Sequence, residues 1–269
     1  MDRITNDRAF FETLGDIYPA SLTTKVSETE IADVKCYWFE PQHCHAENII
    51  VYVHGGSFAM GSINSHQPMV SHIAEYTKTK VLFIEYSLAP EHPFPTAINE
   101  IVSVYKVLLR TNPESKITLI GDSAGGGLTV SSIHAMNENN LELPSAIVLI
   151  SPWLNLTCNT NSHKTRQHLD PILTKQSLLE YAQYYIGDHD STADPNGLLF
   201  SSFPPAFVLV GTNEVLYDDA KNFYDYIKPI QHNTIFKAYQ DQTHVWLLTD
   251  IDSAISKETL QDISDFVND

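Results

Sequence analysis

Short apolar runs recur along the chain and alternate with stretches of helical pattern. The runs are rich in β-branched residues and lack polar alternation, as is typical of parallel strands covered on both faces. They predict strands at residues 49–54, 81–86, 117–122, 146–151, 206–211 and 234–239. The other stretches predict helices at 67–78, 96–109, 124–137, 218–228 and 253–267. This order indicates an α/β fold with a mostly parallel central sheet, flanked by helices and joined by right-handed crossovers.

Two segments do not follow the alternation. They are residues 1–31 and residues 156–202, and the second contains one predicted helix at 175–185. A connection as long as 156–202 between neighbouring strands is usually functional, for example as a lid or cap. We therefore expect one domain over 1–269, with a small helical cap contributed by these two segments.

The charge balance narrows the classes of partner. The chain has 33 acidic and 16 basic residues, a formal net charge of −17. This charge repels nucleic acids and anionic membrane surfaces, so we expect neither as a partner. The N-terminus lacks the apolar core of a signal peptide, and no stretch approaches 18 apolar residues, so we expect a cytoplasmic protein. Homo-oligomerisation is left open.

The cysteines point to a reducing compartment and to no metal site. Cys36, Cys44 and Cys158 are an odd number without framework spacing, so we expect free thiols. The stretch "CYWFEPQHCH", residues 36–45, contains two cysteines and two histidines, but its spacing fits no zinc pattern. It reads as a strand followed by a polar turn, and we expect no metal.

The stretch "GDSAGGG" carries the first candidate chemistry. Ser123 lies between a predicted strand and a predicted helix, with Gly121 and Gly125 on either side. This is the G-x-S-x-G pattern of a nucleophile elbow, in which small residues let strand and helix pass closely. Such a turn exposes the serine hydroxyl. It also directs the N–H of Ala124 and the helix N-terminus toward developing negative charge.

A second glycine-rich stretch, "HGGSFAMGS", follows the first predicted strand. Adjacent glycines allow backbone N–H groups to point at a substrate oxygen. We therefore expect Gly55 and Gly56 to complete an oxyanion hole with Ala124. His54 is expected to be a structural donor that shapes the loop.

A serine nucleophile needs a base and an orienting acid, which follow the serine in this kind of fold in the order acid, then histidine. His244 comes after the last predicted strand and is the expected base. Glu214 follows the preceding strand and is the favoured acid, with Asp218 and Asp219 as alternatives. All lie just past strand ends, where an open α/β sheet places its site.

Large apolar residues flank these motifs. They are candidates for a substrate pocket, and core packing is the alternative interpretation for each. The residues are Phe58, Met60, Trp153, Val245 and Trp246.

Several linked motifs resemble one known family. They are "HGGSFAMGSINSH", "EYSLAPEHPFPTA", "GDSAGGGL", "ISPWLNLT", "VGTNEVLYDDA" and "THVW". Over about residues 49–247 the chain resembles the hormone-sensitive-lipase family (bacterial family IV esterases) of the α/β-hydrolases. The resemblance implies an α/β-hydrolase fold and ester hydrolysis through an acyl-serine. It also implies a Ser123–His244–Glu214 triad and no metal or organic cofactor. The chain departs from the family where Ser57 replaces the third glycine of the loop.

Three classes of function fit these observations. The favoured one is a serine carboxylesterase acting on small, short-chain acyl esters. A deacetylase, lactonase or amidase with the same machinery is the second, and a non-catalytic ligand-binding protein is the third. Only 53 residues precede His54 and the second cap segment is polar, so the chain lacks the broad apolar lid of an interfacial lipase. We therefore expect a preference for acetyl to butyryl esters.

Overall fold

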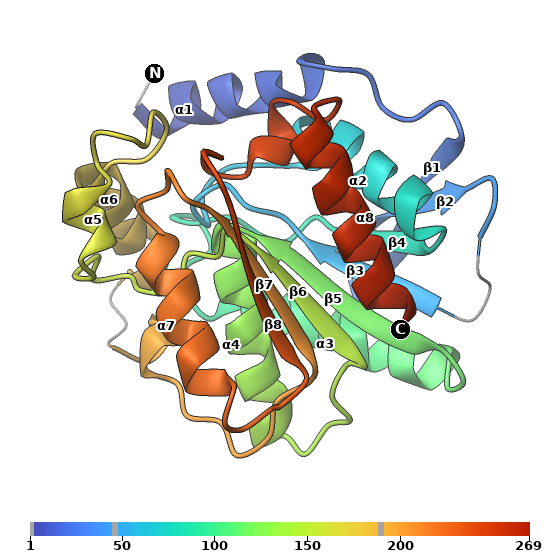
Figure 1. Ribbon diagram of the computed structural model, residues 1–269. Coiled ribbons are helices and arrows are strands. Elements are labelled where there is room, and N and C mark those ends of the chain that lie inside the picture. The colour runs from blue at the N-terminus through green and yellow to red at the C-terminus, as the bar shows by residue number, and fades with distance from the viewer. Residues whose placement is uncertain (1–2, 45–47, 188–190) are drawn as a thin grey trace.

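The computed structural model describes residues 3–44, 48–187 and 191–269 (Figure 1). Its strands are β1 (Thr24–Ile31), β2 (Val34–Pro41), β3 (Asn48–Val53), β4 (Lys80–Ile84), β5 (Lys116–Asp122), β6 (Ala146–Ile150), β7 (Ala206–Gly211) and β8 (Thr234–Tyr239). Its α-helices are α1 (Arg3–Glu12), α2 (Ile63–Thr77), α3 (Thr96–Thr111), α4 (Ala124–Glu138), α5 (Ser162–Thr165), α6 (Lys175–Ile186), α7 (Tyr217–Ile227) and α8 (Ala254–Asn268).

The strands form one sheet in the order β1-β2-β4-β3-β5-β6-β7-β8. β2 is antiparallel to both β1 and β4, and the remaining pairs are parallel. The predicted α/β class and mostly parallel sheet are therefore confirmed. The predicted strands agree with the structure to within two residues. Helix α2 begins four residues earlier than predicted, because Ser62 caps it by accepting a hydrogen bond from the N–H of Asn64 at 3.0 Å.

The expected N-terminal cap segment is too long. Residues Thr24–Ile31 are strand β1 at the edge of the sheet, so among the described residues of this segment only 3–23, with α1 and a 3₁₀ turn at Thr13–Asp16, remain outside the sheet. The edge strand has the sequence "TKVSETEI", in which polar residues predominate because neither face is fully covered. It therefore lacks the continuous apolar run that identified the central strands.

Two hydrophobic cores cover the faces of the sheet. Helices α3, α4 and α7 pack on one face, and α2 and α8 pack together on the other (Figure 1). The central strand β6 is buried at every position, which explains its unbroken apolar sequence. No helix in the described part of the chain is long and apolar enough to cross a membrane.

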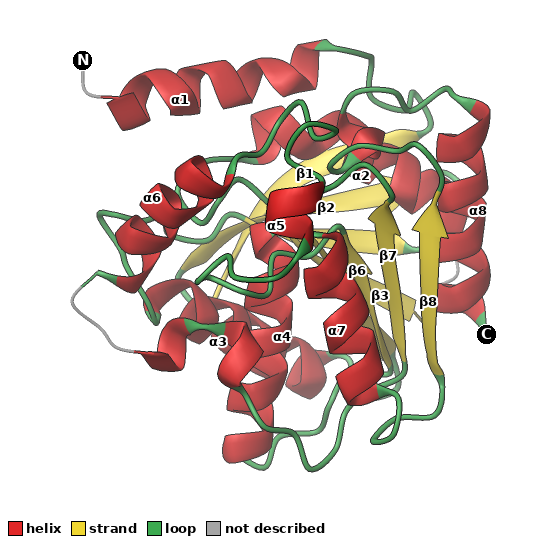
Figure 2. Cartoon of the chain, turned by 60° about the vertical axis from the view of Figure 1, so that its left-hand side comes forward, coloured by secondary structure: helices red, strands yellow, loops and turns green. Residues whose placement is uncertain are grey.

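Helix α1 lies at the end of the molecule toward which β7 and β8 point (Figure 2). None of its residues is fully buried, although Ile4 and Phe11 pack partly against the core, and polar contacts add to its attachment. Arg3 donates two hydrogen bonds to Glu180 of α6, at 2.8 and 2.6 Å. Arg8 donates to the carbonyl oxygens of Ala59 and Ala89, at 2.8 and 2.9 Å. The first of these carbonyls belongs to the glycine-rich loop after β3, so α1 is tied directly to that loop.

Candidate active site

Ser123 occupies a strained turn between β5 and α4. Its backbone has φ 51° and ψ −121°, which a serine adopts only when the surroundings require it. A Cβ atom at Gly121 would lie 2.4 Å from the carbonyl oxygen of Gly125, and one at Gly125 would lie 2.0 Å from that of Val53. The two glycines are therefore needed for the strand and helix to approach this closely.

Three side chains from different strand ends meet at this turn. His244 Nε2 lies 2.8 Å from Ser123 Oγ, and His244 Nδ1 lies 3.0 Å from Glu214 Oε2. Ser123 follows β5, Glu214 follows β7 and His244 follows β8. All three are buried, and Glu214 is fully inaccessible to solvent. The sequence brought these residues forward as candidates, and the fold places them in one hydrogen-bonded chain.

The second oxygen of Glu214 is fixed by two donors. Glu214 Oε1 accepts the hydroxyl of Ser151 at 2.6 Å and the N–H of Gly211 at 2.5 Å. Ser151 Oγ also accepts the N–H of Val245 at 3.2 Å, so it connects the acid to the residue after His244. Sequence analysis did not select Ser151. Its signal is its place at the end of β6, next to the strand that precedes Glu214.

Burial and mutual contact set the ionisation of this pair. Burial raises the pKa of Glu214 against the opposing effect of its hydrogen bonds. Burial disfavours the charged form of His244, but the contact with Glu214, together with the charges of Asp170 and Asp122, outweighs burial and raises the pKa of His244. Because the carboxylate accepts from Nδ1, we assign the proton of the neutral imidazole to that nitrogen. Nε2 is then free to accept the proton of Ser123.

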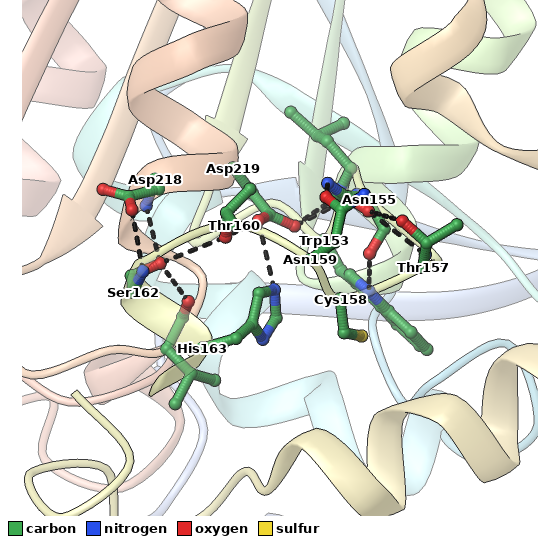
Figure 3. A network of polar contacts seen from close by, with 12 residues as sticks. Trp153, Asn155, Thr157, Cys158, Asn159, Thr160, Ser162, His163, Asp218 and Asp219 are labelled. Carbon is green, nitrogen blue, oxygen red and sulfur yellow. Dashed lines mark hydrogen bonds and ion pairs between the residues drawn. The ribbon is translucent and has the colours of Figure 1, made fainter. Parts of the chain in front are cut away.

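Asp218 and Asp219 contact the segment of residues 153–163 (Figure 3). Asp218 accepts the N–H of Ser162 at 2.7 Å. Asp219 accepts the N–H of Asn155 at 3.0 Å and lies 3.2 Å from Nε2 of His163. Both carboxylates are therefore occupied in holding the loop of residues 153–163 against α7. Of the three acids considered from the sequence, the fold places only Glu214 against His244.

One predicted oxyanion donor is wrong. The N–H of Gly55 donates to Asp122 Oδ1 at 2.9 Å, so it is not available to a substrate. The same oxygen accepts the hydroxyl of Tyr52 at 2.8 Å. Burial opposes the charge of Asp122, but nearby His66 and Tyr52 keep the pKa of this carboxyl below its ordinary value. A Cβ at Gly55 would lie 2.2 Å from Asp122 Oδ2, so this glycine serves close packing.

The neighbouring N–H groups remain available. Within residues 3–44, 48–187 and 191–269, no acceptor is hydrogen-bonded to the backbone N–H of Gly56, Ser57 or Ala124. Gly56 has φ 109°, and a Cβ there would lie 2.2 Å from the carbonyl oxygen of Met60, so only glycine fits. Ser57 also has a positive φ, of 55°. The sequence analysis selected donors by their glycine residues. It therefore did not select Ser57, whose backbone N–H is a donor whatever its side chain.

His54 is buried beside this loop and contacts its backbone. Its Nδ1 lies 2.7 Å from the carbonyl oxygen of Gly55, and its ring stacks on Tyr86 with centroids 4.2 Å apart. Burial and the neighbouring His66 lower the pKa of His54 to about 3. The ring is therefore neutral and donates Nδ1–H to the loop, which agrees with the expected structural role.

The candidate pocket residues divide between the two cores. Phe58, Met60 and Trp153 lie in the core under α3 and α4, and the rings of Phe58 and Trp153 are 5.1 Å apart. Val245 and Trp246 lie in the other core, beneath α8, and are 1% and 2% exposed. Their place in that core fits the alternative interpretation of core packing, and a role of these two in the pocket stays a prediction.

Among the residues that the structure describes, no group of three or more histidine, cysteine, aspartate or glutamate side chains is arranged to hold a metal ion. His45, the last residue of the segment considered for zinc, lies outside the described residues. The expectation of no cofactor stays a prediction.

Comparisons with known proteins agree with this geometry. A family model described as the alpha/beta hydrolase fold matches residues 50–248. The chain is 33% identical to an acetyl-hydrolase of Streptomyces hygroscopicus over 250 residues, covering 91% of this chain and 81% of that protein. It is 30% identical to an esterase of Acinetobacter venetianus over 264 residues, covering 96% and 87%. An esterase structure from the bacterial hormone-sensitive lipase family superposes with a TM-score of 0.95 at 29% identity, covering 99% of this chain and 91% of that one.

The chain belongs to the hormone-sensitive lipase family of α/β-hydrolases. It is a carboxylic-ester hydrolase, in agreement with the favoured prediction, and its substrates are small-molecule esters. A second structure in this set, an esterase/lipase from an uncultured bacterium, superposes with a TM-score of 0.93 at 30% identity over the whole of this chain and 91% of that one.

Proposed function

We propose that this esterase hydrolyses short-chain acyl esters with a triad of Ser123, His244 and Glu214. The continuous chain of contacts from Ser123 Oγ through the imidazole to Glu214, at 2.8 and 3.0 Å, is the observation that carries the proposal. Such a chain lets the histidine take the serine proton while the carboxylate holds the ring in the required tautomer.

The reaction proceeds in two halves. Ser123 Oγ attacks the ester carbonyl carbon as its proton passes to His244 Nε2, giving a tetrahedral oxyanion. The imidazolium then protonates the departing alcohol, and the acyl group remains on Ser123. Water attacks this acyl-serine with His244 again as base, and the carboxylic acid leaves as Ser123 regains its proton.

The oxyanion is stabilised by the N–H groups of Gly56, Ser57 and Ala124. Two observations support this assignment: these groups lack acceptors among the described residues, and Ala124 opens helix α4, whose N-terminal end favours negative charge. One donor of this kind typically accounts for about 2.7–4 kcal/mol of transition-state stabilisation. Asp122 contributes indirectly, because it ties the N–H of Gly55 to the end of β5, the strand that precedes Ser123.

The preference for small acyl groups is supported by the crowding around the serine. Ser123 is 6% exposed, and the buried ring of Phe58 lies against Gly127, one helical turn further along α4, with the buried ring of Trp153 5.1 Å from it. The name of the Streptomyces relative, acetyl-hydrolase, favours removal of an acetyl group as the activity. A sugar or metabolite that carries an acetyl ester is a substrate of this class, which is the deacetylase alternative of the sequence analysis.

A panel of p-nitrophenyl esters from acetate to decanoate tests this proposal, with kcat/KM as the readout. We expect the maximum between acetate and butyrate and a decline beyond roughly six to eight acyl carbons, since a methylene that does not fit costs strain. A maximum at decanoate, or a jump in rate when emulsified long-chain triglyceride forms an interface, would contradict it. Ser123→Ala is the blank for background hydrolysis.

A further inference from the structure

The cap segment (residues 156–202) and the loop of residues 54–62, here called the oxyanion loop, make contact through two aromatic rings. Tyr185 lies on the buried face of α6 and is 3% exposed. Its ring stacks on that of Phe58, with centroids 3.9 Å apart and planes inclined by 14°. Phe58 comes directly after Ser57 in the loop that carries the proposed oxyanion donors. The stack therefore joins α6 to the loop without a gap between the rings.

This stack lies close to the reactive serine. A Cβ atom at Gly127, one helical turn after Ser123, would lie 3.7 Å from Cζ of Phe58. Trp153, whose ring is 5.1 Å from that of Phe58, donates its backbone N–H to the carbonyl oxygen of Ser123 at 2.9 Å. The rings therefore border the first turn of α4, beside the serine that would carry the acyl group.

A cavity lies on the other side of the stack. Phe94 meets Tyr185 edge-on at 5.9 Å, and its N–H donates to the carbonyl oxygen of Tyr185 at 2.8 Å. Phe94 also lines a cavity of about 420 Å³ between α3 and α4, together with Ile98 and Ser131. Ser131 is eight residues beyond Ser123 on α4, or about 12 Å along the helix axis. The aromatic rings thus separate the serine from unfilled space beside the same helix.

We propose that the stacked rings of Tyr185 and Phe58 form the end wall of the acyl site and set the length of acyl chain that the esterase accepts. This inference rests on the proposed short-chain function and names the residues that enforce it. An acyl chain on Ser123 that runs along α4 meets the rings after a few carbons. With the ring of Tyr185 removed, the chain can continue toward the cavity, and each methylene that is newly buried contributes about a fourfold gain.

The test is the ratio of kcat/KM for p-nitrophenyl octanoate to that for p-nitrophenyl acetate. In Tyr185→Ala we expect this ratio to rise at least about tenfold over the wild-type value, the gain from two or three additional methylenes. Tyr185→Phe should keep the wild-type ratio, because the Tyr185 hydroxyl has no hydrogen-bond partner among the described residues. A selective gain of this kind is not expected from a loss of stability alone.

Phe203→Ala is the matched control. Phe203 is a buried ring of the same core, 4.9 Å from Phe200 and 5.6 Å from Phe223, and lies outside the proposed wall. Its truncation should lower stability and leave the ratio unchanged. If Tyr185→Ala does not fold, Tyr185→Leu gives the same comparison with a smaller cavity, and a raised ratio is again expected.

The outcomes separate the two proposals. A wild-type maximum at decanoate would overturn the short-chain function itself. A short-chain wild-type profile with an unchanged ratio in folded Tyr185→Ala or Tyr185→Leu would overturn only the wall. An equal rise in Phe203→Ala would also overturn it, since the effect would then come from general loosening of the core.

Discussion

Replacing Glu214 by glutamine separates the proposed orienting acid from its neighbours. The carboxylate has two oxygens with different partners: Oε1 accepts from Ser151 and Gly211, and Oε2 accepts from His244. A glutamine has only one accepting oxygen. Two donors, Ser151 and Gly211, face one side of this group, and only His244 faces the other. The amide should therefore place its oxygen toward Ser151 and its NH₂ group toward the imidazole.

That orientation forces the wrong tautomer. An NH₂ group facing His244 Nδ1 requires a bare nitrogen there, so the proton moves to Nε2, which can then no longer accept from Ser123. Where an acid-to-amide change acts in this way, kcat falls about 10⁴-fold, which corresponds to about 5.5 kcal/mol of transition-state stabilisation. We expect a loss of this size in kcat for p-nitrophenyl acetate, with KM changed by less than about threefold because the carboxylate does not contact substrate.

The matched control is Asp218→Asn, the same chemical change four residues further on. Its carboxylate accepts a hydrogen bond from the N–H of Ser162 in the cap loop, a bond that asparagine can retain through its own oxygen. We therefore expect a kcat close to that of the wild type. The reasoning is refuted if Glu214→Gln keeps more than a tenth of the activity, or if Asp218→Asn proves to be the crippling change.

Three further predictions follow from the site and its supports. Burial lowers the pKa of His244, but its acidic neighbours, Glu214 first, raise it above its ordinary value. The ratio kcat/KM should therefore rise with pH through one ionisation that lies above that of a free imidazole, because only the neutral ring acts as base; an acidic optimum would contradict this. Gly56→Ala should lower kcat by about 10²–10³ through displacement of the oxyanion loop, and near-normal turnover would exclude the assigned donor. Asp219→Ala leaves the buried N–H of Asn155 and the ring of His163 without their acceptor, so chemical denaturation should report a loss of about 3 kcal/mol or more, and an unchanged midpoint would contradict that.

The sequence was sufficient for the fold and for the catalytic candidates. Buried parallel strands have unbroken apolar runs, and the turn at Ser123 requires glycines at fixed positions, so both leave a direct trace in the residue types. The edge strand Thr24–Ile31 leaves no such trace, because its exposed positions are polar. The residue pattern therefore does not separate this strand from the cap.

The remaining differences concern contacts between distant segments. Gly55 was assigned as a donor, although its N–H is taken by Asp122, 67 residues away in the chain. Trp246 is a pocket candidate by its position in the sequence, and the fold packs its ring 5.0 Å from that of Tyr239 in the second core. Tyr185 was not considered, because nothing in a lone cap helix indicates which loop it will touch. Each of these depends on the relative placement of elements that a residue pattern does not specify.

The central claim is that Ser123 is the nucleophile. Incubation with diethyl p-nitrophenyl phosphate, followed by peptide mass spectrometry, tests this most directly, since the reagent phosphorylates an activated serine and releases p-nitrophenol. We predict one equivalent of p-nitrophenol, complete loss of esterase activity and a single adduct on the peptide that contains Ser123, with no adduct in Ser123→Ala. An adduct at another residue, or full activity in the Ser123→Ala protein, would contradict the account.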